Sequence, residues 1–430
     1  MKRLKLLCLL LALTLGFQTI YAQPQRIGNS NVYYELFFNG SDSTLKFTGT
    51  GILPYSSSLT TYYRTSVKHI EIGEGITTIG NIAFRDWIAL EKVNLPNSLK
   101  KIESYAFNND TALRTINLPK QLEIIESSAF LLTKCLPDTL SFPTLFPNLI
   151  SFGKGRDYNS FGNTFYGTTI KHVVIPLKTD TIFSDFVQCK QLSSVILPAT
   201  LKHFIKGTFY NDTALKLVID LNPIPQTFEV PKGYNNAFDN VKRSQCRLIV
   251  PTSAVDLYKS TPIWQDFLIE GGGLSAGASV NAKEKGNIRG VEYRFYQKGE
   301  HITWKAEPVE GCTFSGWRSN GEWISTGQTL SFTITKDTMI EAVFDGEPLS
   351  VPISSEKHAM VSIYPNPAQN QFTVNSNSAI NCIILYDLSG RKVLQTSNSC
   401  TVDVSGMAKG AYWVEIRTDE GRYMKKFIRQ

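Results

Sequence analysis

One phrase recurs at a fixed spacing and constrains the fold more than any other feature of the chain. It is an isoleucine followed four and five residues later by Ala-Phe, and its copies end at Phe84, Phe107 and Phe130, each 23 residues from the next. A second phrase keeps the same spacing, at Ile72-Gly73, Leu95-Pro96 and Leu118-Pro119. A constant period of this length indicates a solenoid, in which each unit buries its apolar face against its neighbours.

One unit predicts a short strand, a bend and a turn. Val93 and Leu95 alternate with polar residues, which suits a strand with one buried face. Pro96 ends that strand because it has no N–H to donate to a sheet. We expect Leu99 to point into the coil and Phe107 to close the turn.

Beyond the three clear copies the repeat continues, but the spacing between copies varies. Strand ends are expected at Ile72, Leu95, Leu118, Phe142, Ile175, Leu197 and Ile219. Turn aromatics are expected at Phe84, Phe107, Phe130, Phe165, Phe186, Phe209 and Phe238. We interpret the wide gaps near 131–169 and 220–245 as insertions within the array.

The turn I-x-x-x-A-F and the strand end V-x-L-P resemble the BspA-type leucine-rich repeats of bacterial surface proteins, over roughly residues 31–268. This resemblance implies a curved right-handed solenoid with a parallel sheet on one face. It also implies a role in binding rather than in catalysis.

The sequence predicts a signal peptide before the solenoid and a cap at each of its ends. Residues 1–22 read as a secretory signal peptide, because a basic start precedes an apolar run and a small residue at Ala22. The run is too short to span a membrane comfortably, so we expect no transmembrane segment after signal removal. Residues 23–66 are predicted to cap the first coil, which would otherwise expose its apolar face. The repeats and their C-terminal cap are expected over 67–270, with Trp264 covering the last coil.

Residues 271–345 lack the period and predict a separate module of about four antiparallel strands. The phrases Gly311-Cys312-Thr313-Phe314-Ser315-Gly316-Trp317 and Ala342-Val343-Phe344 resemble the internalin-type B repeat, a β-grasp-like module of bacterial surface proteins. That resemblance implies spacing or weak interaction. We expect Trp304 and Trp317 in its core rather than on a ligand platform.

Residues 361–430 follow a linker at 346–360 and predict a small antiparallel β-sandwich. Their phrases Tyr364-Pro365-Asn366-Pro367, Leu385-Tyr386-Asp387-Leu388-Ser389-Gly390-Arg391 and Met407-Ala408-Lys409-Gly410-Ala411-Tyr412 resemble the C-terminal sorting domain of the type IX secretion system of Bacteroidota. This resemblance implies export by that machinery, then attachment to the cell surface or release. The expected fold class is mainly β: a leucine-rich repeat solenoid, a β-grasp-like module and a C-terminal β-sandwich.

The formal net charge of +7 is concentrated at the two ends. Lys2, Arg3 and Lys5 contribute +3, and residues 361–430 contribute 8 basic against 5 acidic side chains, another +3. The part between is near +1. This argues against the basic face that binding to nucleic acid or to a membrane surface uses, so no nucleic-acid partner is expected.

The reactive side chains do not form a known catalytic or metal-binding pattern. There is no C-x-x-C or H-E-x-x-H spacing, nucleophile elbow, phosphate loop or dinucleotide fingerprint. We therefore expect no metal, no cofactor and no enzyme activity. Cys382 and Cys400 begin two predicted strands of one domain and either form a disulfide or stay as free thiols. Cys189 and Cys246 are expected as buried free thiols.

If the solenoid binds a partner, the outward positions of its strands would carry the site. The alternation places them in two columns, made of His69, Glu71, Lys92, Asn94, Thr115, Asn117, His172, Val174, Ser194 and Ile196. The alternative is a face that is merely solvated.

Six triplets that begin with Asp-Ser or Asp-Thr resemble the O-glycosylation triplet of exported Bacteroidota proteins. The acceptors would be Ser43, Thr111, Thr139, Thr181, Thr213 and Thr338. The alternative is that these pairs belong to repeat turns, where an Asp side chain bonds the backbone.

The sequence thus predicts an exported protein at the outer-membrane surface or secreted. The favoured function is adhesion to a protein or glycan of a host or neighbouring cell. The alternatives are a structural or antigenic coat protein without a single ligand, and a carrier whose activity lies in an undetected site.

Overall fold

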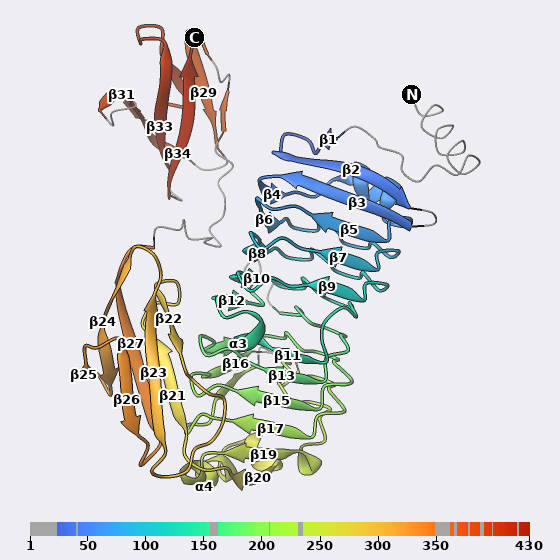
Figure 1. The fold of residues 1–430 in the computed structure, drawn as a ribbon, viewed down its shortest axis with the longest axis vertical. Coiled ribbons are helices and arrows are strands. Elements are labelled where there is room, and N and C mark those ends of the chain that lie inside the picture. The colour runs from blue at the N-terminus through green and yellow to red at the C-terminus, as the bar shows by residue number, and fades with distance from the viewer. Residues whose placement is uncertain are drawn as a thin grey trace. The chain divides into compact units, whose positions relative to one another are not determined.

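The computed structural model describes residues 24–39, 42–154, 162–205, 207–230, 235–348, 362–364, 368–376, 379–387, 391–397, 399–418 and 421–430. The chain divides into two compact units, Met1–Ile353 and Ser354–Gln430. Figure 1 shows the repeats and the following module in the first unit and a separate β-domain in the second. The predicted signal peptide and most of the predicted linker lie outside the described residues.

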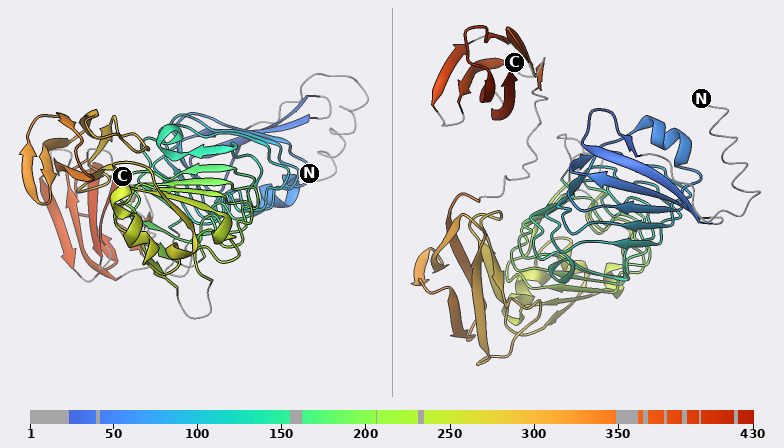
Figure 2. Two further views of the ribbon diagram at one scale, coloured as in Figure 1. Left: turned by 90° about the horizontal axis from the view of Figure 1, so that it is seen from below. Right: turned by 45° about the horizontal axis from the view of Figure 1, so that its top comes forward.

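Successive coils of the repeats place one strand each in a main sheet, and an insertion divides this sheet into two (Figures 1 and 2). The first main sheet has the order β1 (Gln25–Arg26), β2 (Val32–Asn39), β3 (Asp42–Gly49), β5 (His69–Ile72), β7 (Lys92–Asn94) and β9 (Thr115–Asn117). The second has the order β11 (Thr139–Ser141), β13 (His172–Val174), β15 (Ser194–Leu197), β17 (Leu217–Asp220), β19 (Arg247–Val250) and β20 (Leu268–Gly271). From β3 onward all these pairings are parallel.

Two further parallel ladders run along another side of the coils. One contains β4 (Gly51–Leu53), β6 (Ile76–Ile79), β8 (Lys101–Ile102), β10 (Ile124–Ile125) and β12 (Ser151–Phe152). The other contains β14 (Thr181–Ile182), β16 (His203–Ile205) and β18 (Thr227–Glu229). Short helices α2 (Ser57–Tyr63), α3 (Phe142–Leu145) and α4 (Val255–Lys259) lie between strands. The mainly β, leucine-rich-repeat-like architecture predicted from the period is confirmed.

The turn aromatics form one continuous column through the core. All seven predicted phenylalanines are buried, and successive rings from Phe84 to Phe238 stack with centroids 5.3–6.2 Å apart. The peptide N–H of each, from Phe84 to Phe209, donates to the carbonyl of the residue preceding the next phenylalanine. Stacked, offset rings are a favourable aromatic geometry. Each coil is therefore held to the next by both its core and its backbone.

The two ends of the column are covered. At the start, β2 and β3 form an antiparallel hairpin whose inward Leu45 and Phe47 are fully buried, and Phe47 contacts the ring of Phe84 edge-on at 5.6 Å. At the far end, Trp264 is fully buried against Phe238 at 5.3 Å. These contacts satisfy the requirement that terminal coils of an array be capped.

The module after the repeats has two sheets and its own core. One sheet has the order β21 (Ala276–Val280), β27 (Thr338–Gly346), β24 (Cys312–Ser319) and β25 (Glu322–Ser325). The other has the order β22 (Gly286–Arg289), β23 (His301–Pro308) and β26 (Thr329–Thr333). Trp304 and Trp317 are fully buried between them, as expected. The first and last strands, β21 and β27, are parallel neighbours, so the strands are not all antiparallel as the sequence predicted.

The second unit is a β-sandwich. A sheet of β28 (Ser362–Tyr364), β29 (Gln371–Asn375) and β32 (Thr401–Asp403) accompanies one of β31 (Lys392–Ser397), β30 (Ile380–Tyr386), β33 (Gly410–Thr418) and β34 (Gly421–Arg429). All pairings within the two sheets are antiparallel, and a shared core includes Phe372 and Phe427. Cys382 lies on β30 and Cys400 precedes β32 in the other sheet, and both thiols are free. The structure gives the disulfide no support.

We expect Phe107→Ala to lower the free energy of unfolding of the repeats by about 3–5 kcal/mol, because it leaves a cavity between two stacked neighbours. Urea unfolding followed by tryptophan fluorescence, to which the buried Trp87 and Trp264 of the repeats contribute, measures this. Ile88→Ala is the control, since this side chain is 51% exposed and its truncation is expected to cost less than about 0.5 kcal/mol. Equal losses in the two variants would contradict a role of the column in stability.

Candidate functional site

The ten outward positions predicted from the alternation all lie on main-sheet strands, and each is exposed or half-buried. In the first main sheet His69, Lys92 and Thr115 are in register, and Glu71, Asn94 and Asn117 form the parallel row. In the second main sheet His172 pairs with Ser194, and Val174 pairs with Ile196. The structure therefore brings together six of the residues on one sheet and four on the other, across the break between β9 and β11.

The two halves of this surface differ in chemistry. The first half is polar, and its row Lys46, Glu71, Asn94 and Asn117 is exposed or half-buried. The second half carries Val174, Ile196, Ile219 and Ile249 in register, all half-buried, and we call these four residues the apolar row. Sequence reasoning found only the first two of them, because it did not extend the columns to β17 and β19.

Some outward side chains already have structural partners. The Asn117 amide donates to the Leu95 carbonyl at 2.9 Å and accepts from the Leu95 N–H at 2.6 Å. His172 Nδ1 lies 2.8 Å from Ser194 Oγ. Asn117 therefore supports the adjacent coil, while Lys92 and Glu71 are exposed.

The predicted glycosylation acceptors lie in different environments. Ser43 is buried and its hydroxyl donates to the Ser66 carbonyl at 2.7 Å, so the folded protein leaves this predicted acceptor inaccessible. Thr181 and Thr338 are half-buried, whereas Thr111, Thr139 and Thr213 are exposed. Asp110, which precedes Thr111, is fully buried and accepts from the Trp87 N–H at 2.8 Å. At that triplet the Asp serves a repeat turn, which is the alternative weighed from the sequence.

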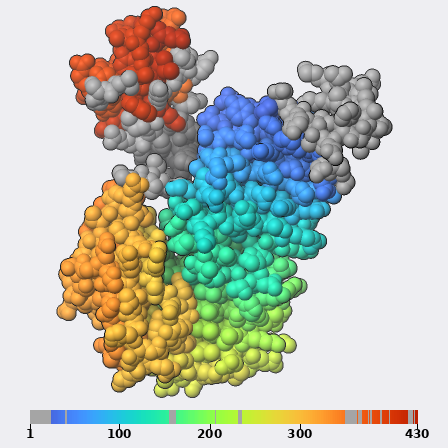
Figure 3. All heavy atoms as spheres, in the orientation of Figure 1, coloured from blue at the N-terminus to red at the C-terminus, as the bar shows by residue number. Residues whose placement is uncertain are grey.

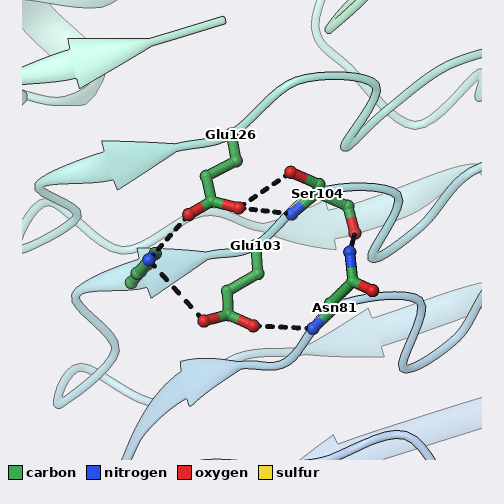
Figure 4. A network of polar contacts seen from close by, with 5 residues as sticks. Asn81, Glu103, Ser104 and Glu126 are labelled. Atoms are coloured by element: carbon green, nitrogen blue, oxygen red, sulfur yellow. Dashed lines mark hydrogen bonds and ion pairs between the residues drawn. The ribbon is translucent and has the colours of Figure 1, made fainter. Parts of the chain in front are cut away.

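A buried polar network crosses three coils on the β6–β8–β10 side (Figure 4). Lys101 Nζ lies 2.7 Å from Glu126 Oε1 and 3.6 Å from Glu103 Oε1, and all three side chains are almost fully buried. Glu103 accepts from the Asn81 N–H at 2.8 Å, and Glu126 accepts from the N–H and hydroxyl of Ser104 at 2.9 and 2.8 Å. The network therefore ties neighbouring turns together inside the array.

The sequence contained a signal for this network that the apolar pattern concealed. Glu103 and Glu126 each follow an inward isoleucine in the repeated phrase. A charged residue kept at the same position in two copies indicates a common partner, and the buried Lys101 is that partner.

The module is joined to the repeats by several direct contacts (Figure 3). The Tyr293 hydroxyl accepts a hydrogen bond from the Leu177 N–H at 2.8 Å, and Lys178 Nζ donates to the Lys283 carbonyl at 2.6 Å. Lys283 forms an ion pair with Asp180 at 3.2 Å. Leu177 also packs against the core of the module.

A cleft of about 760 Å³ lies beside this junction. One wall comes from residues 177–180, 199, 200, 202, 203, 222–225 and 227 of the repeats, and the other comes from β21, β24, β27 and the loops beside them. Concave sites between packed parts of a protein are common places for ligands. Sequence reasoning missed this cleft because its walls are about 100 residues apart in the chain, and no local pattern links them.

One wall of the cleft is supported by the buried Asp220. Its Oδ1 accepts from the Asn222 N–H at 3.1 Å and from Gln226 Nε2 at 3.0 Å, and burial raises the pKa of this carboxyl to about 7. The Tyr258 hydroxyl has one proton but lies 2.9 Å from both Asp220 Oδ2 and the Asn222 carbonyl. The hydroxyl therefore donates to the carboxylate and to this carbonyl in a shared, three-centre hydrogen bond.

The described residues hold neither a cluster of metal ligands nor a membrane-spanning helix. No group of three His, Cys, Asp or Glu side chains suited to a metal ion occurs in the part of the chain that the structure describes. Within the same residues, no helix is long and apolar enough to cross a membrane. Cys189 and Cys246 are buried free thiols, as expected.

Comparison with known families agrees with this architecture. Six copies of the BspA type leucine rich repeat region match residues 58–154 and 158–245. The solenoid is a BspA-type leucine-rich repeat array. A divergent InlB B-repeat domain matches residues 277–348, and a secretion system C-terminal sorting domain matches residues 362–430. These families are not catalytic, and the sorting domain indicates export by the type IX machinery to the outer-membrane surface or as a secreted protein.

Several solved structures are similar to this chain. A leucine-rich repeat protein from Eubacterium ventriosum is 14% identical over 61% of this chain and 80% of its own, with a TM-score of 0.36. One from Bacteroides ovatus is 17% identical over 53% and 71%, with a TM-score of 0.30. The pneumococcal vaccine antigen PcpA is 15% identical over 55% and 82%, with a TM-score of 0.23. No curated protein matches the chain at a significant level.

We expect Lys101→Met to destabilise the leucine-rich repeats by about 3–5 kcal/mol, because it leaves two buried carboxylates without their cation. Thermal and urea unfolding measure the loss. Lys100→Met is the matched control, since Lys100 pairs with Glu123 at 3.1 Å near the surface and its loss is expected to cost at most about 1 kcal/mol. A control variant as unstable as Lys101→Met would show that the buried network has no special role.

We expect Asp220→Asn to change the pH dependence of stability. The folded pKa of Asp220, about 7, lies above the unfolded value of about 3.9, so the parent loses stability as pH rises between these values. Asparagine carries no charge. The free energy of unfolding of the variant relative to the parent should therefore rise by about 1.4 kcal/mol per pH unit from about pH 4 to 7, then level off. Urea titrations at pH 4.5, 6 and 8 test this, and a difference that does not vary with pH would contradict it.

Proposed function

We propose that this exported leucine-rich repeat protein is an adhesin, which binds a macromolecule of a host or of a neighbouring cell across the outward rows of its main sheets. It acts by binding and not by catalysis. The observation that carries this proposal is the register of the outward side chains, which are exposed or half-buried on strand after strand.

The spacing of these rows suits an extended partner. Strands in a sheet are about 4.8 Å apart, so residues from separate coils form one continuous surface. Because the column of stacked rings and the backbone bonds fix each coil, these residues are held in place before a partner arrives. A surface ordered in advance loses less entropy on binding.

The two halves of the surface offer complementary contacts. His69, Glu71 and Lys92 can form hydrogen bonds and ion pairs in the first half. The apolar row can bury aliphatic surface in the second half, and contiguous apolar groups outside a core are a frequent sign of an interaction site. A protein or glycan partner could contact both.

We expect the purified chain to bind saturably to at least one immobilised extracellular-matrix protein or arrayed glycan in physiological salt. Changing His69, Lys92 and His172 together to alanine is expected to weaken that binding at least tenfold, because it removes three polar contacts from the rows. Surface plasmon resonance measures the change.

Lys134→Ala with Lys190→Ala is the control, since both lysines are exposed outside the strands. Binding that survives the triple change but is lost in the control would place the site elsewhere. Failure to bind any probe would favour a coat or antigenic role instead.

A further inference from the structure

The cleft between the repeats and the module has an excess of positive charge. Its wall residues include Lys178, Lys202, Lys283 and Lys336, and its acidic residues are Asp180, Asp337 and Glu341. Arg318 lies directly behind, in an ion pair with Glu341 at 2.8 Å. The four lysines and three carboxylates that line the cleft leave a net charge of +1.

The carboxylates already have partners. Asp180 pairs with Lys283, and Glu341 pairs with Arg318. Asp337 accepts from the Ser275 N–H at 2.7 Å and from the Ser253 hydroxyl. These three carboxylates therefore stabilise the walls of the cleft through ion pairs and hydrogen bonds.

Three of the lysines, by contrast, form no ion pair with any residue that the structure describes. Lys202 and Lys336 are exposed at the cleft. Lys178 lies deeper, where its ammonium donates to the Lys283 carbonyl, and desolvation lowers its pKa to about 8. It thus keeps its charge at pH 7, and the cleft presents unpaired cations to a ligand.

An exposed aromatic ring extends the same wall. Ser279, Glu341, Arg318 and Trp323 are cross-strand neighbours in a row over four strands, and the first two line the cleft. The Arg318 guanidinium lies 5.2 Å from the centre of the Trp323 ring. Although Trp323 is a large apolar side chain, it is 56% exposed.

Gly316 leaves the space that the ring of this tryptophan occupies beside β24. A Cβ at that position would come within 2.7 Å of Trp323 Cζ3, and its backbone has φ +152°. The ring lies outside the cleft lining, two strands beyond Glu341, and its exposed part faces solvent there. An exposed aromatic ring held by its neighbours is suited to stacking against the C–H face of a sugar.

The neutral polar groups of the cleft match sugar hydroxyls. The Thr200 hydroxyl donates to the Leu177 carbonyl, and the Ser319 hydroxyl donates to the Met339 carbonyl. With their protons used in this way, both oxygens keep lone pairs that can accept from a ligand. Both residues line the cleft.

We propose that this cleft binds an acidic oligosaccharide, with Lys202 and Lys336 contacting its carboxylate or sulfate groups and Trp323 stacking on a sugar ring. Lys178 adds positive charge at depth. The site is separate from the rows of the main sheets, so it does not rest on the adhesin proposal. Charge-assisted hydrogen bonds supply affinity for the acid groups, and the aromatic ring distinguishes a sugar from a simple anion.

Isothermal titration calorimetry on the full chain tests this with four probes of matched length. They are a heparin-derived hexasaccharide, hexagalacturonic acid, neutral chitohexaose and hexaglutamate. We expect one or both acidic saccharides to bind, and the comparison separates sulfate from carboxylate recognition. Chitohexaose is expected to bind at least tenfold more weakly, since it lacks the acid groups.

Variants then locate the site. The double variant Lys202→Ala, Lys336→Ala is expected to lower the affinity for the saccharide at least tenfold. Trp323→Ala is expected to lower it by a similar factor, while Trp323→Phe retains most of the affinity. The Lys134→Ala, Lys190→Ala control and the His69, Lys92, His172 triple variant should both keep it. Unchanged melting temperatures would show that each variant folds.

Three results would overturn the proposal. The first is no binding of either acidic saccharide. The second is saccharide binding that survives the lysine and tryptophan changes, or that the triple variant of the rows abolishes. The third is hexaglutamate binding as tight as that of the saccharide and insensitive to Trp323→Ala, which would indicate an acidic peptide. Failure of the adhesin experiment alone leaves these measurements unaffected.

Discussion

The contact between one coil and the next is the interaction on which the rest of the structure depends. A single coil has too little apolar surface to fold by itself, and its stability comes from the neighbours on either side. The stacked phenylalanines provide this contact in the core, and the peptide N–H of each ring residue provides it in the backbone. Because the same contact repeats, each ring has to lie against the ring of the next coil. The constant spacing of Phe84, Phe107 and Phe130 meets this requirement with coils of equal length.

The insertion after the third clear repeat has a different effect. It ends the first main sheet at β9, and pairing resumes with β11 and β13. The core continues across the break, since Phe130 stacks on Phe165 at 6.2 Å. The backbone of the main sheet is therefore interrupted while the column of rings is not. This separates a polar surface from one with an apolar row, and each can change without disturbing the other.

The sequence predicted the positions that its periodicity determines and missed two features that depend on packing between segments. The positions of Phe84 to Phe238 were correct because periodicity fixes them, and the orientation of His69 and Val174 followed from strand alternation. Lys101 was missed because a lysine at a buried position breaks the apolar pattern. Its burial is understood only once its ion pairs with Glu103 and Glu126 are seen. The cleft was missed because it depends on the contact of Leu177 with Tyr293, which are 116 residues apart. Long-range packing of this kind leaves no local signal.

The pairing of β21 with β27 has a mechanical consequence. The chain enters the module at Ala276, the start of β21, and leaves at Gly346, the end of β27. Because these neighbouring strands are parallel, a tensile load between the two points pulls them past each other along their length. The hydrogen bonds between them are then loaded in shear and resist together, instead of opening one at a time. A module of this topology can transmit force from a tethered end to the repeats without unravelling first.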